Sequence, residues 1–143
     1  MKNNTYITTS DLETQKIGED FAKELSSGEN VFLYGDLGFG KTTFAKGVAK
    51  GLNIKSRIIS PTFVIVRQHQ AQQANIKVLY HIDLYRIESQ SQLAEVGIKE
   101  IMEDTKSVKL IEWPEKIESG KHHWEVKLSL SSDNVRTINI NKI

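Results

Sequence analysis

The sequence contains no cysteine, so several kinds of chemistry are excluded at once. Such a chain forms no disulfide, binds no metal through thiolates and has no cysteine nucleophile. Long apolar runs are also missing. None approaches the roughly 18 residues of a membrane-spanning helix, and the first ten residues are mostly polar. We therefore expect a cytoplasmic protein that works without a membrane.

An excess of charge of one sign is absent too. Lys and Arg number 19 against 18 Asp and Glu, which gives a net charge of +1, and no basic run occurs. Electrostatics alone therefore gives no case for direct nucleic-acid binding, and a role on RNA would pass through a partner. The 143 residues, 38% apolar and 26% charged, predict a single domain over 1–143 with a sizeable core.

One stretch, VFLYGDLGFGKTT at residues 31–43, combines three local signals. Residues 31–34 form a short apolar run of the kind that makes a buried strand. Residues 35–42 fit G-x-x-x-x-G-K-[ST] without a mismatch. Residues 44–52 place apolar side chains at helical spacing. A glycine-rich turn with a chance lysine is the alternative, but the complete motif between a strand and a helix favours a phosphate-binding loop.

Each residue type in this loop suits phosphate chemistry. Glycines accept positive φ and let backbone amides approach a ligand closely. The helix that follows adds free N–H groups and the positive end of its dipole. The Lys41 ammonium suits the β- and γ-phosphates, and the Thr42 hydroxyl suits Mg²⁺. We expect the nucleotide to be bound by Asp36, Leu37, Gly38, Phe39, Gly40, Lys41, Thr42 and Thr43.

The remaining chain predicts strands and helices around this loop. Ser10 and Glu13 form a capping-box signature for a helix from 11 to about 25. Strands are expected at 5–8, 64–69, 76–83, 108–111, 124–130 and 135–140, and a further helix at 89–103. Two pairs, 64–69 with 76–83 across a turn at 70–75 and 124–130 with 135–140, are typical of antiparallel hairpins. The prediction is an α/β fold, one P-loop NTPase domain whose mixed sheet has a parallel core, antiparallel hairpins and flanking helices.

Two acidic residues follow predicted strands and are candidates for the chemistry. Asp83 follows residues 78–82, and Glu112 follows residues 108–111. Ligands of α/β sheets bind beside the carboxyl ends of the strands, and NTP hydrolysis or transfer needs an acid there. For each, a strand-end acid that caps a turn is the alternative. We expect His81, on the face of Asp83, to be structural rather than catalytic. Residues 60–62 are either a loop that senses the γ-phosphate or a proline turn.

Four sequence blocks then occur in a fixed order. They are GDLG-x-GKTT at 35–43, SPTF at 60–63, YH-x-DLYR at 80–86 and LIEWPE at 110–115. Together they resemble the TsaE (YjeE) family, the small bacterial ATPase of tRNA threonylcarbamoyladenosine biosynthesis, over roughly residues 9–140.

The resemblance implies ATP and Mg²⁺ as cofactors. It implies that Thr42 and Glu112 hold Mg²⁺ and that Asp83 is the catalytic carboxylate near the γ-phosphate. Asp11 and Arg136 are weaker candidates for positions near the base. It further assigns Thr62 to a switch-like loop and places Trp113 beside the site.

The partner implied by the resemblance is the TsaB–TsaD pair, which transfers threonylcarbamoyl to adenosine in tRNA. ATP hydrolysis would reset that complex between turnovers, and tRNA would be met only through it. Two departures stand out: Phe39 replaces a small residue, and residues 121–124 replace a Leu-Pro pair before the last hairpin.

Two other functions remain open. A small-molecule P-loop kinase usually carries a basic lid, for which the chain has only four arginines, at 57, 67, 86 and 136. A regulatory GTPase is disfavoured because no N-K-x-D or D-x-x-G motif is present.

Overall fold

The computed structural model describes residues 3–36, 40–58, 65–117 and 122–143. Leu37, Gly38 and Phe39 of the predicted loop lie outside the described residues, as do the residues of the 60–63 block. The strands are β1 (Asn4–Thr8), β2 (Asn30–Tyr34), β3 (Val66–Gln73), β4 (Ile76–Asp83), β5 (Ser107–Glu112), β6 (Trp124–Ser132) and β7 (Val135–Lys142). The helices are α1 (Asp11–Ala22), α2 (Lys41–Gly51), α3 (Gln90–Glu95), α4 (Ile98–Glu103) and the short 3₁₀ turn η1 (Pro114–Lys116).

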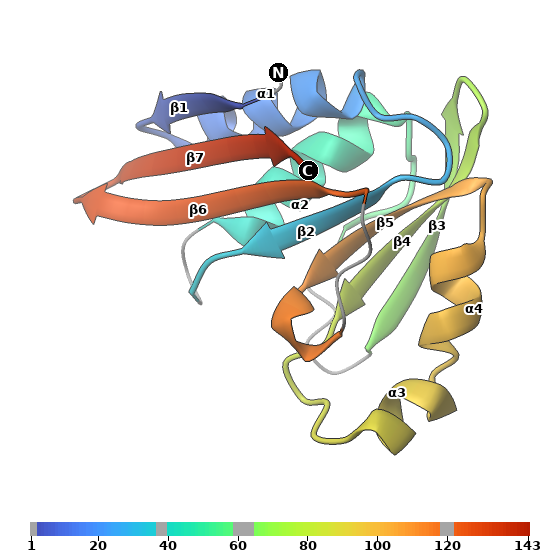
Figure 1. The fold of residues 1–143 in the computed structure, drawn as a ribbon. Coiled ribbons are helices and arrows are strands. Elements are labelled where there is room, and N and C mark those ends of the chain that lie inside the picture. The colour runs from blue at the N-terminus through green and yellow to red at the C-terminus, as the bar shows by residue number, and fades with distance from the viewer. Residues whose placement is uncertain (1–2, 37–39, 59–64, 118–121) are drawn as a thin grey trace.

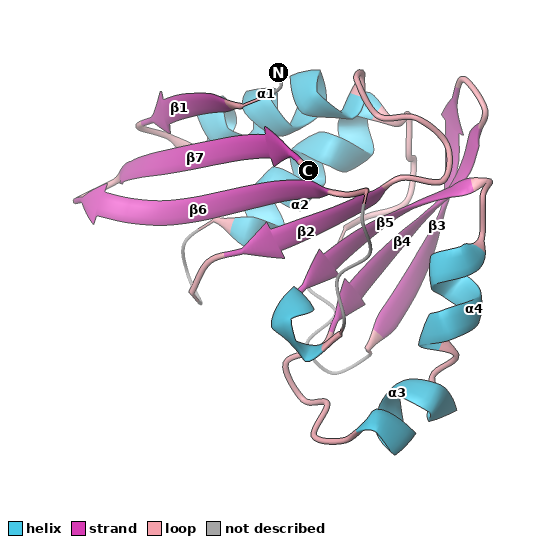
Figure 2. Cartoon of the chain, in the orientation of Figure 1, coloured by secondary structure: helices cyan, strands magenta, loops and turns pink. Residues whose placement is uncertain are grey.

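The seven strands form one mixed sheet in the order β1-β7-β6-β2-β5-β4-β3 (Figure 2). β2 is parallel to both β5 and β6, and β4 is parallel to β5. The pairs β3–β4, β6–β7 and β1–β7 are antiparallel. The predicted α/β class, with a parallel centre and antiparallel hairpins, is therefore confirmed.

Helices cover both faces of this sheet, with α1 and α2 on one face and α3 and α4 on the other (Figure 1). Successive side chains of a strand point to opposite faces, so β2 contributes to two apolar clusters. Val31 and Leu33 pack in the larger cluster with the helix side chains of Phe21 and Phe44. Phe32 packs on the other face with the smaller cluster. A central strand with parallel neighbours is buried on both faces, which explains its continuous apolar sequence.

α1 and α2 approach each other unusually closely. A Cβ placed on Gly47 would lie 2.1 Å from the carbonyl oxygen of Gln15, and one on Gly18 would lie 2.5 Å from that of Phe44. The two backbones therefore meet through glycines, where any side chain would force them apart. This contact fixes α2, and with it the end of the predicted phosphate loop, against α1.

Three local predictions need correction. The single helix expected at 89–103 is two short helices, because Gly97 adopts a left-handed φ of 73° between α3 and α4. The turn expected at 70–75 is confined to Ala74–Asn75, since β3 continues to Gln73 through a register shift after Gln70. α1 ends at Ala22 rather than near residue 25, and the amides of Glu24 and Leu25 make turn hydrogen bonds three residues back.

The predicted capping box at the start of α1 is present in a shifted form. The Ser10 hydroxyl accepts a hydrogen bond from the Glu13 amide at 3.1 Å. Glu13 in turn accepts from the Thr9 amide at 2.6 Å, one residue earlier than the N-cap. None of the helices in the described ranges is both long enough and apolar enough to cross a membrane.

Candidate functional site

In the predicted phosphate loop, residues 35–36 follow the carboxyl end of β2, and Gly40 comes directly before the first residue of α2. Gly35 and Gly40 both have positive φ, 150° and 95°. Gly40 is the N-cap of α2 and supplies no side-chain hydrogen bond to it. The first amides of α2 therefore have no side-chain cap, and amides of this kind bind anions.

The other predicted loop residues in the described chain surround this helix start. Asp36 lies, with Gly35 and Lys41, on the wall of a small hollow of about 70 Å³ that also contacts Tyr34 and Trp113. Lys41 is the first residue of α2, and Thr42 and Thr43 follow it, half-buried, in the first turn.

Asp11 and Arg136 meet beside the loop, although they are 125 residues apart in the chain. The Arg136 Nη1 donates to Asp11 Oδ1 at 2.7 Å and to the Thr14 hydroxyl at 3.3 Å. A Cβ on Gly40 would lie only 3.1 Å from Arg136 Nε, so the guanidinium lies against the loop backbone. Both residues line a surface hollow of about 330 Å³ together with Thr9, Ser10 and Asn134.

The two predicted acids lie side by side at the carboxyl edge of the sheet. Asp83 ends β4 and Glu112 ends β5, and the two are direct partners in the parallel register. In the next strand, Leu33 of β2 is opposite Glu112. Asp83 is 7% exposed and Glu112 4%, so both carboxylates are nearly out of water.

The carboxylate of Glu112 has a different partner on each oxygen. Its Oε1 lies 3.7 Å from the Nζ of Lys41, which is itself 6% exposed. Its Oε2 lies 2.7 Å from the Nε2 of His81. The Lys41 ammonium also lies 4.8 Å from the ring centroid of Trp113, a cation–π contact. The loop motif predicted the lysine and the strand end predicted the acid, but neither pattern predicted that the two side chains pair.

Asp83 is held differently. Its Oδ1 accepts a hydrogen bond from the Tyr85 amide at 2.9 Å, so the carboxylate caps the turn that follows β4. Burial raises the pKa of Asp83, and the neighbouring Glu112 raises it further, whereas the Tyr85 hydrogen bond and Lys41 lower it. The turn-capping alternative is thus true of Asp83, and it fixes the orientation of this acid at the edge of the site.

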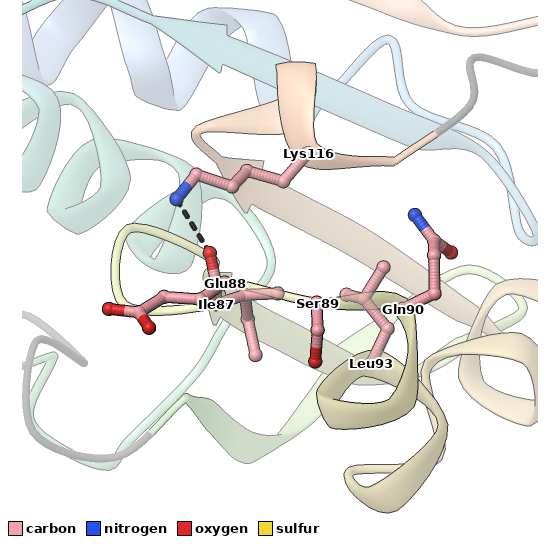
Figure 3. Close-up of a pocket in the computed structure, with 6 residues that line it drawn as sticks. All are labelled: Ile87, Glu88, Ser89, Gln90, Leu93 and Lys116. Atoms are coloured by element: carbon pink, nitrogen blue, oxygen red, sulfur yellow. Dashed lines mark hydrogen bonds between the residues drawn. The ribbon is translucent and has the colours of Figure 1, made fainter.

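Two loops after the acids are tied together by one lysine. Lys116 of η1 donates from Nζ to the carbonyl oxygen of Ile87 at 2.7 Å (Figure 3). It also donates to the carbonyl oxygen of Tyr85 at 3.0 Å. The segment after Asp83 is therefore fixed to the segment after Glu112. A third hollow, of about 530 Å³, lies here and is lined by Ile87, Glu88, Ser89, Gln90, Leu93 and Lys116 (Figure 3).

Trp113, between Glu112 and η1, has an unexpected backbone conformation. Its φ of 58° lies in the left-handed region, which is costly for a bulky residue. The indole contacts Tyr85, with 5.0 Å between ring centroids, and forms the wall above Lys41. The position of Trp113 beside the site agrees with the resemblance, but no local pattern indicated this turn.

The arrangement fits a magnesium nucleotide better than a metal held by protein alone. Among the residues that the structure describes, no group of three or more His, Asp or Glu side chains is arranged to hold a metal ion. Mg²⁺ typically binds one or two carboxylates and takes its other ligands from water and phosphate. Glu112, with the Thr42 hydroxyl one residue after Lys41, supplies hard oxygens of the required kind. The glycine backbone and uncapped helix amides fit the phosphates.

Comparison with known proteins identifies the family of this chain. The family model described as "Threonylcarbamoyl adenosine biosynthesis protein TsaE" matches residues 8–138. A Rickettsia bellii protein named tRNA threonylcarbamoyladenosine biosynthesis protein TsaE is 37% identical, covering 98% of this chain and 96% of its own length. The Bacillus subtilis protein of the same name is 34% identical over 96% of this chain and 85% of its length.

The structural comparison gives the same result. A crystal structure of YdiB from Bacillus subtilis superposes with a TM-score of 0.78, at 28% identity, over 97% of this chain and 84% of that one. The family match covers nearly the whole chain, including all four sequence blocks, and the folds agree. The chain therefore belongs to the TsaE family of tRNA threonylcarbamoyladenosine biosynthesis proteins.

Proposed function

We propose that this chain binds ATP with Mg²⁺ at the phosphate loop and hydrolyses it, in the cytoplasm, in support of threonylcarbamoyl transfer to tRNA adenosine by a TsaB–TsaD complex. The observation that carries the proposal is the burial of Lys41, Asp83 and Glu112 together beside the uncapped start of α2. Buried charges are costly unless they are paired or serve a ligand. Here they lie where a nucleotide would place its phosphates.

Each side chain has a distinct role in this proposal. The amides of the loop and the Lys41 ammonium hold the phosphates. Thr42 and Glu112 hold Mg²⁺, which when bound neutralises charge on the phosphate oxygens. Lys41 must then leave Glu112 for the phosphates. Their 3.7 Å separation is longer than a normal hydrogen bond, so this exchange breaks no tight contact.

Asp83 is the proposed catalytic carboxylate, and it orients the water that attacks the γ-phosphate. The Tyr85 hydrogen bond holds its Oδ1, so the direction of the carboxylate is fixed before the nucleotide binds. Because burial raises the pKa of Asp83, the carboxylate is also a stronger base than an exposed one.

Asp11 and Arg136 form the base side of the site in this proposal. The guanidinium lies against Gly40 and at the wall of the 330 Å³ hollow. An arginine plane is suited to stacking on a nucleotide base. The Asp11 contact keeps that plane in place.

Reconstitution tests the proposal directly. Purified chain would be added to TsaB–TsaD with tRNA, ATP, Mg²⁺ and an activated threonylcarbamoyl donor, while modified adenosine and inorganic phosphate are measured. We expect several product molecules per TsaB–TsaD complex with the chain and about one without it. Product formation independent of the chain, or a phosphorylated small molecule in place of inorganic phosphate, would contradict the proposal.

A further inference from the structure

The two oxygens of the Glu112 carboxylate have contacts of different length, and the shorter contact is with His81. On one side the ammonium of Lys41 lies 3.7 Å from Oε1, an ion pair without hydrogen-bond contact. On the other side the imidazole Nε2 of His81 lies 2.7 Å from Oε2. One oxygen is therefore held tightly and the other loosely. His81 itself is fully buried, with 0% exposure.

We propose that His81 is a positioning residue for Glu112, holding Oε2 so that Oε1 can exchange the Lys41 ammonium for a divalent cation. The inference rests on the proposed binding of a magnesium nucleotide at this loop. It assigns His81 a role that the sequence pattern did not, since the sequence favoured a merely structural histidine.

The position of His81 in the sheet supports this role. On the parallel pair β4–β5, His81 is opposite Leu110, and Asp83 is opposite Glu112. Side chains two residues apart on a strand share one face, so His81 and Glu112 lie diagonally on the site face. The imidazole is anchored on a strand that is paired on both sides, with β3 and with β5. Such an anchor moves less than a loop and can fix a ligand side chain.

The hydrogen bonding of His81 also argues against a packing role alone. A carboxylate oxygen only accepts, so Nε2 carries the proton and donates to Glu112. The other nitrogen, Nδ1, is buried and has no hydrogen-bond partner among the residues that the structure describes. Leaving a buried polar atom unpaired is unfavourable. A leucine in place of His81 would fill this space without that cost, as Leu79 does on the same strand face. Such a leucine would lack the contact with Glu112.

Three substitutions separate the positioning role from packing. His81→Gln can place an amide N–H near the position of Nε2, whereas His81→Asn, one methylene shorter, places it near Nδ1. His81→Leu keeps volume and has no donor. His69→Gln is the matched control, because His69 is another buried histidine of this sheet face but bonds the Ser56 hydroxyl at 2.8 Å.

The measurement is the affinity of a fluorescent, non-hydrolysable ATP analogue, titrated in EDTA and over a series of Mg²⁺ concentrations. Groups that orient metal ligands typically change metal affinity by about 10- to 100-fold. We expect the half-saturating Mg²⁺ concentration to rise by about that factor in His81→Leu and His81→Asn, with wild-type affinity in EDTA. His81→Gln and His69→Gln should stay close to wild type.

Each other outcome contradicts a stated part of the account. If His81→Asn retains Mg²⁺ dependence as well as His81→Gln, or if affinity falls equally with and without Mg²⁺, His81 is a packing residue. If neither His81→Gln nor His81→Leu folds, as judged by circular dichroism and thermal melting, position 81 needs the imidazole for folding rather than a hydrogen-bond donor for Glu112. If the wild-type chain binds the analogue without any Mg²⁺ dependence, the proposed function itself fails, whatever the variants do.

Discussion

The substitution Asp83→Asn should separate catalysis from stability in one position. Asparagine keeps the shape of the side chain, and its Oδ1 can still accept the hydrogen bond that Asp83 takes from the Tyr85 amide at 2.9 Å. The turn after β4 is therefore retained. What is lost is one negative charge at the edge of the site, 7% exposed and beside Glu112.

The expected effect on stability follows from the pKa of Asp83. Burial, the largest cause, raises the pKa of this carboxyl above its usual value, so folding favours the protonated form. A carboxyl whose pKa is higher in the folded than in the unfolded state stabilises the fold fully at a pH below its unfolded pKa. This stabilisation is lost as the pH rises through the folded pKa. At pH 7 the ionised Asp83 thus opposes folding. We expect Asp83→Asn to unfold no more easily than wild type, and Asp83→Ala to lose about 1 kcal/mol with the Tyr85 hydrogen bond.

The expected effect on catalysis is large by contrast. A positioned general base contributes about 10² to 10⁴ in rate, so hydrolysis should fall at least about 100-fold, equivalent to about 2.7 kcal/mol in the barrier. ATP affinity should stay within a few-fold, because the role lies in the chemical step. Phosphate release in the presence of TsaB–TsaD, with urea unfolding at pH 7, measures both quantities. Wild-type hydrolysis in Asp83→Asn would refute the catalytic role, and a stability loss equal to that of Asp83→Ala would show a structural one.

Three further predictions concern Glu112, His69 and Arg136. Glu112→Gln should weaken nucleotide binding in Mg²⁺, because a carboxylate ligand of the cation is lost. Binding in EDTA should be unchanged or tighter, because Lys41 no longer has to break its ion pair with Glu112 to reach the phosphates. Equal losses in the two titrations would make Glu112 structural. Burial lowers the pKa of His69, so its stabilising contribution is full above the unfolded pKa of about 6.5 and is lost as pH falls through the folded value. His69→Gln should therefore reduce the slope of the unfolding free energy against pH between pH 7 and 5, by at most about 1.4 kcal/mol per pH unit. An unchanged slope would contradict this effect of His69. Arg136→Ala should reduce ATP affinity while changing stability by less than about 1 kcal/mol, since its partner Asp11 is largely exposed; unchanged affinity would remove Arg136 from the base side.

The sequence predicted those parts of the site that depend on local rules. The loop at 35–42 is a contiguous motif, and Asp83 and Glu112 follow apolar strands. Parallel strands bring their carboxyl ends to one edge, so two acids that end such strands lie at the same edge. The register confirms that they do. The roles assigned to these residues stay predictions until the measurements above are made.

The parts that the sequence did not predict depend on contacts between distant strands. The bonding of His81 to Glu112 requires β4 beside β5 in one particular register, which no local pattern encodes. The left-handed backbone of Trp113 and the pairing of Lys41 with Glu112 are likewise tertiary features. Gly97 is an intermediate case, because a glycine inside a helical pattern was visible, but its left-handed φ was not.

The most direct test of the central claim is a titration of Mg²⁺ and non-hydrolysable ATP into the wild-type chain and Lys41→Ala. Lys41 is buried between Glu112 and the ring of Trp113, and its removal leaves Glu112 bonded to His81, so the variant should fold. The lost charge-assisted phosphate contact is worth about 1.5–3 kcal/mol, which corresponds to about a 10- to 100-fold loss of ATP affinity. That loss in a folded variant is the predicted result. Equal ATP affinity in wild type and folded Lys41→Ala would contradict the assignment of residues 35–42 as the nucleotide-binding loop.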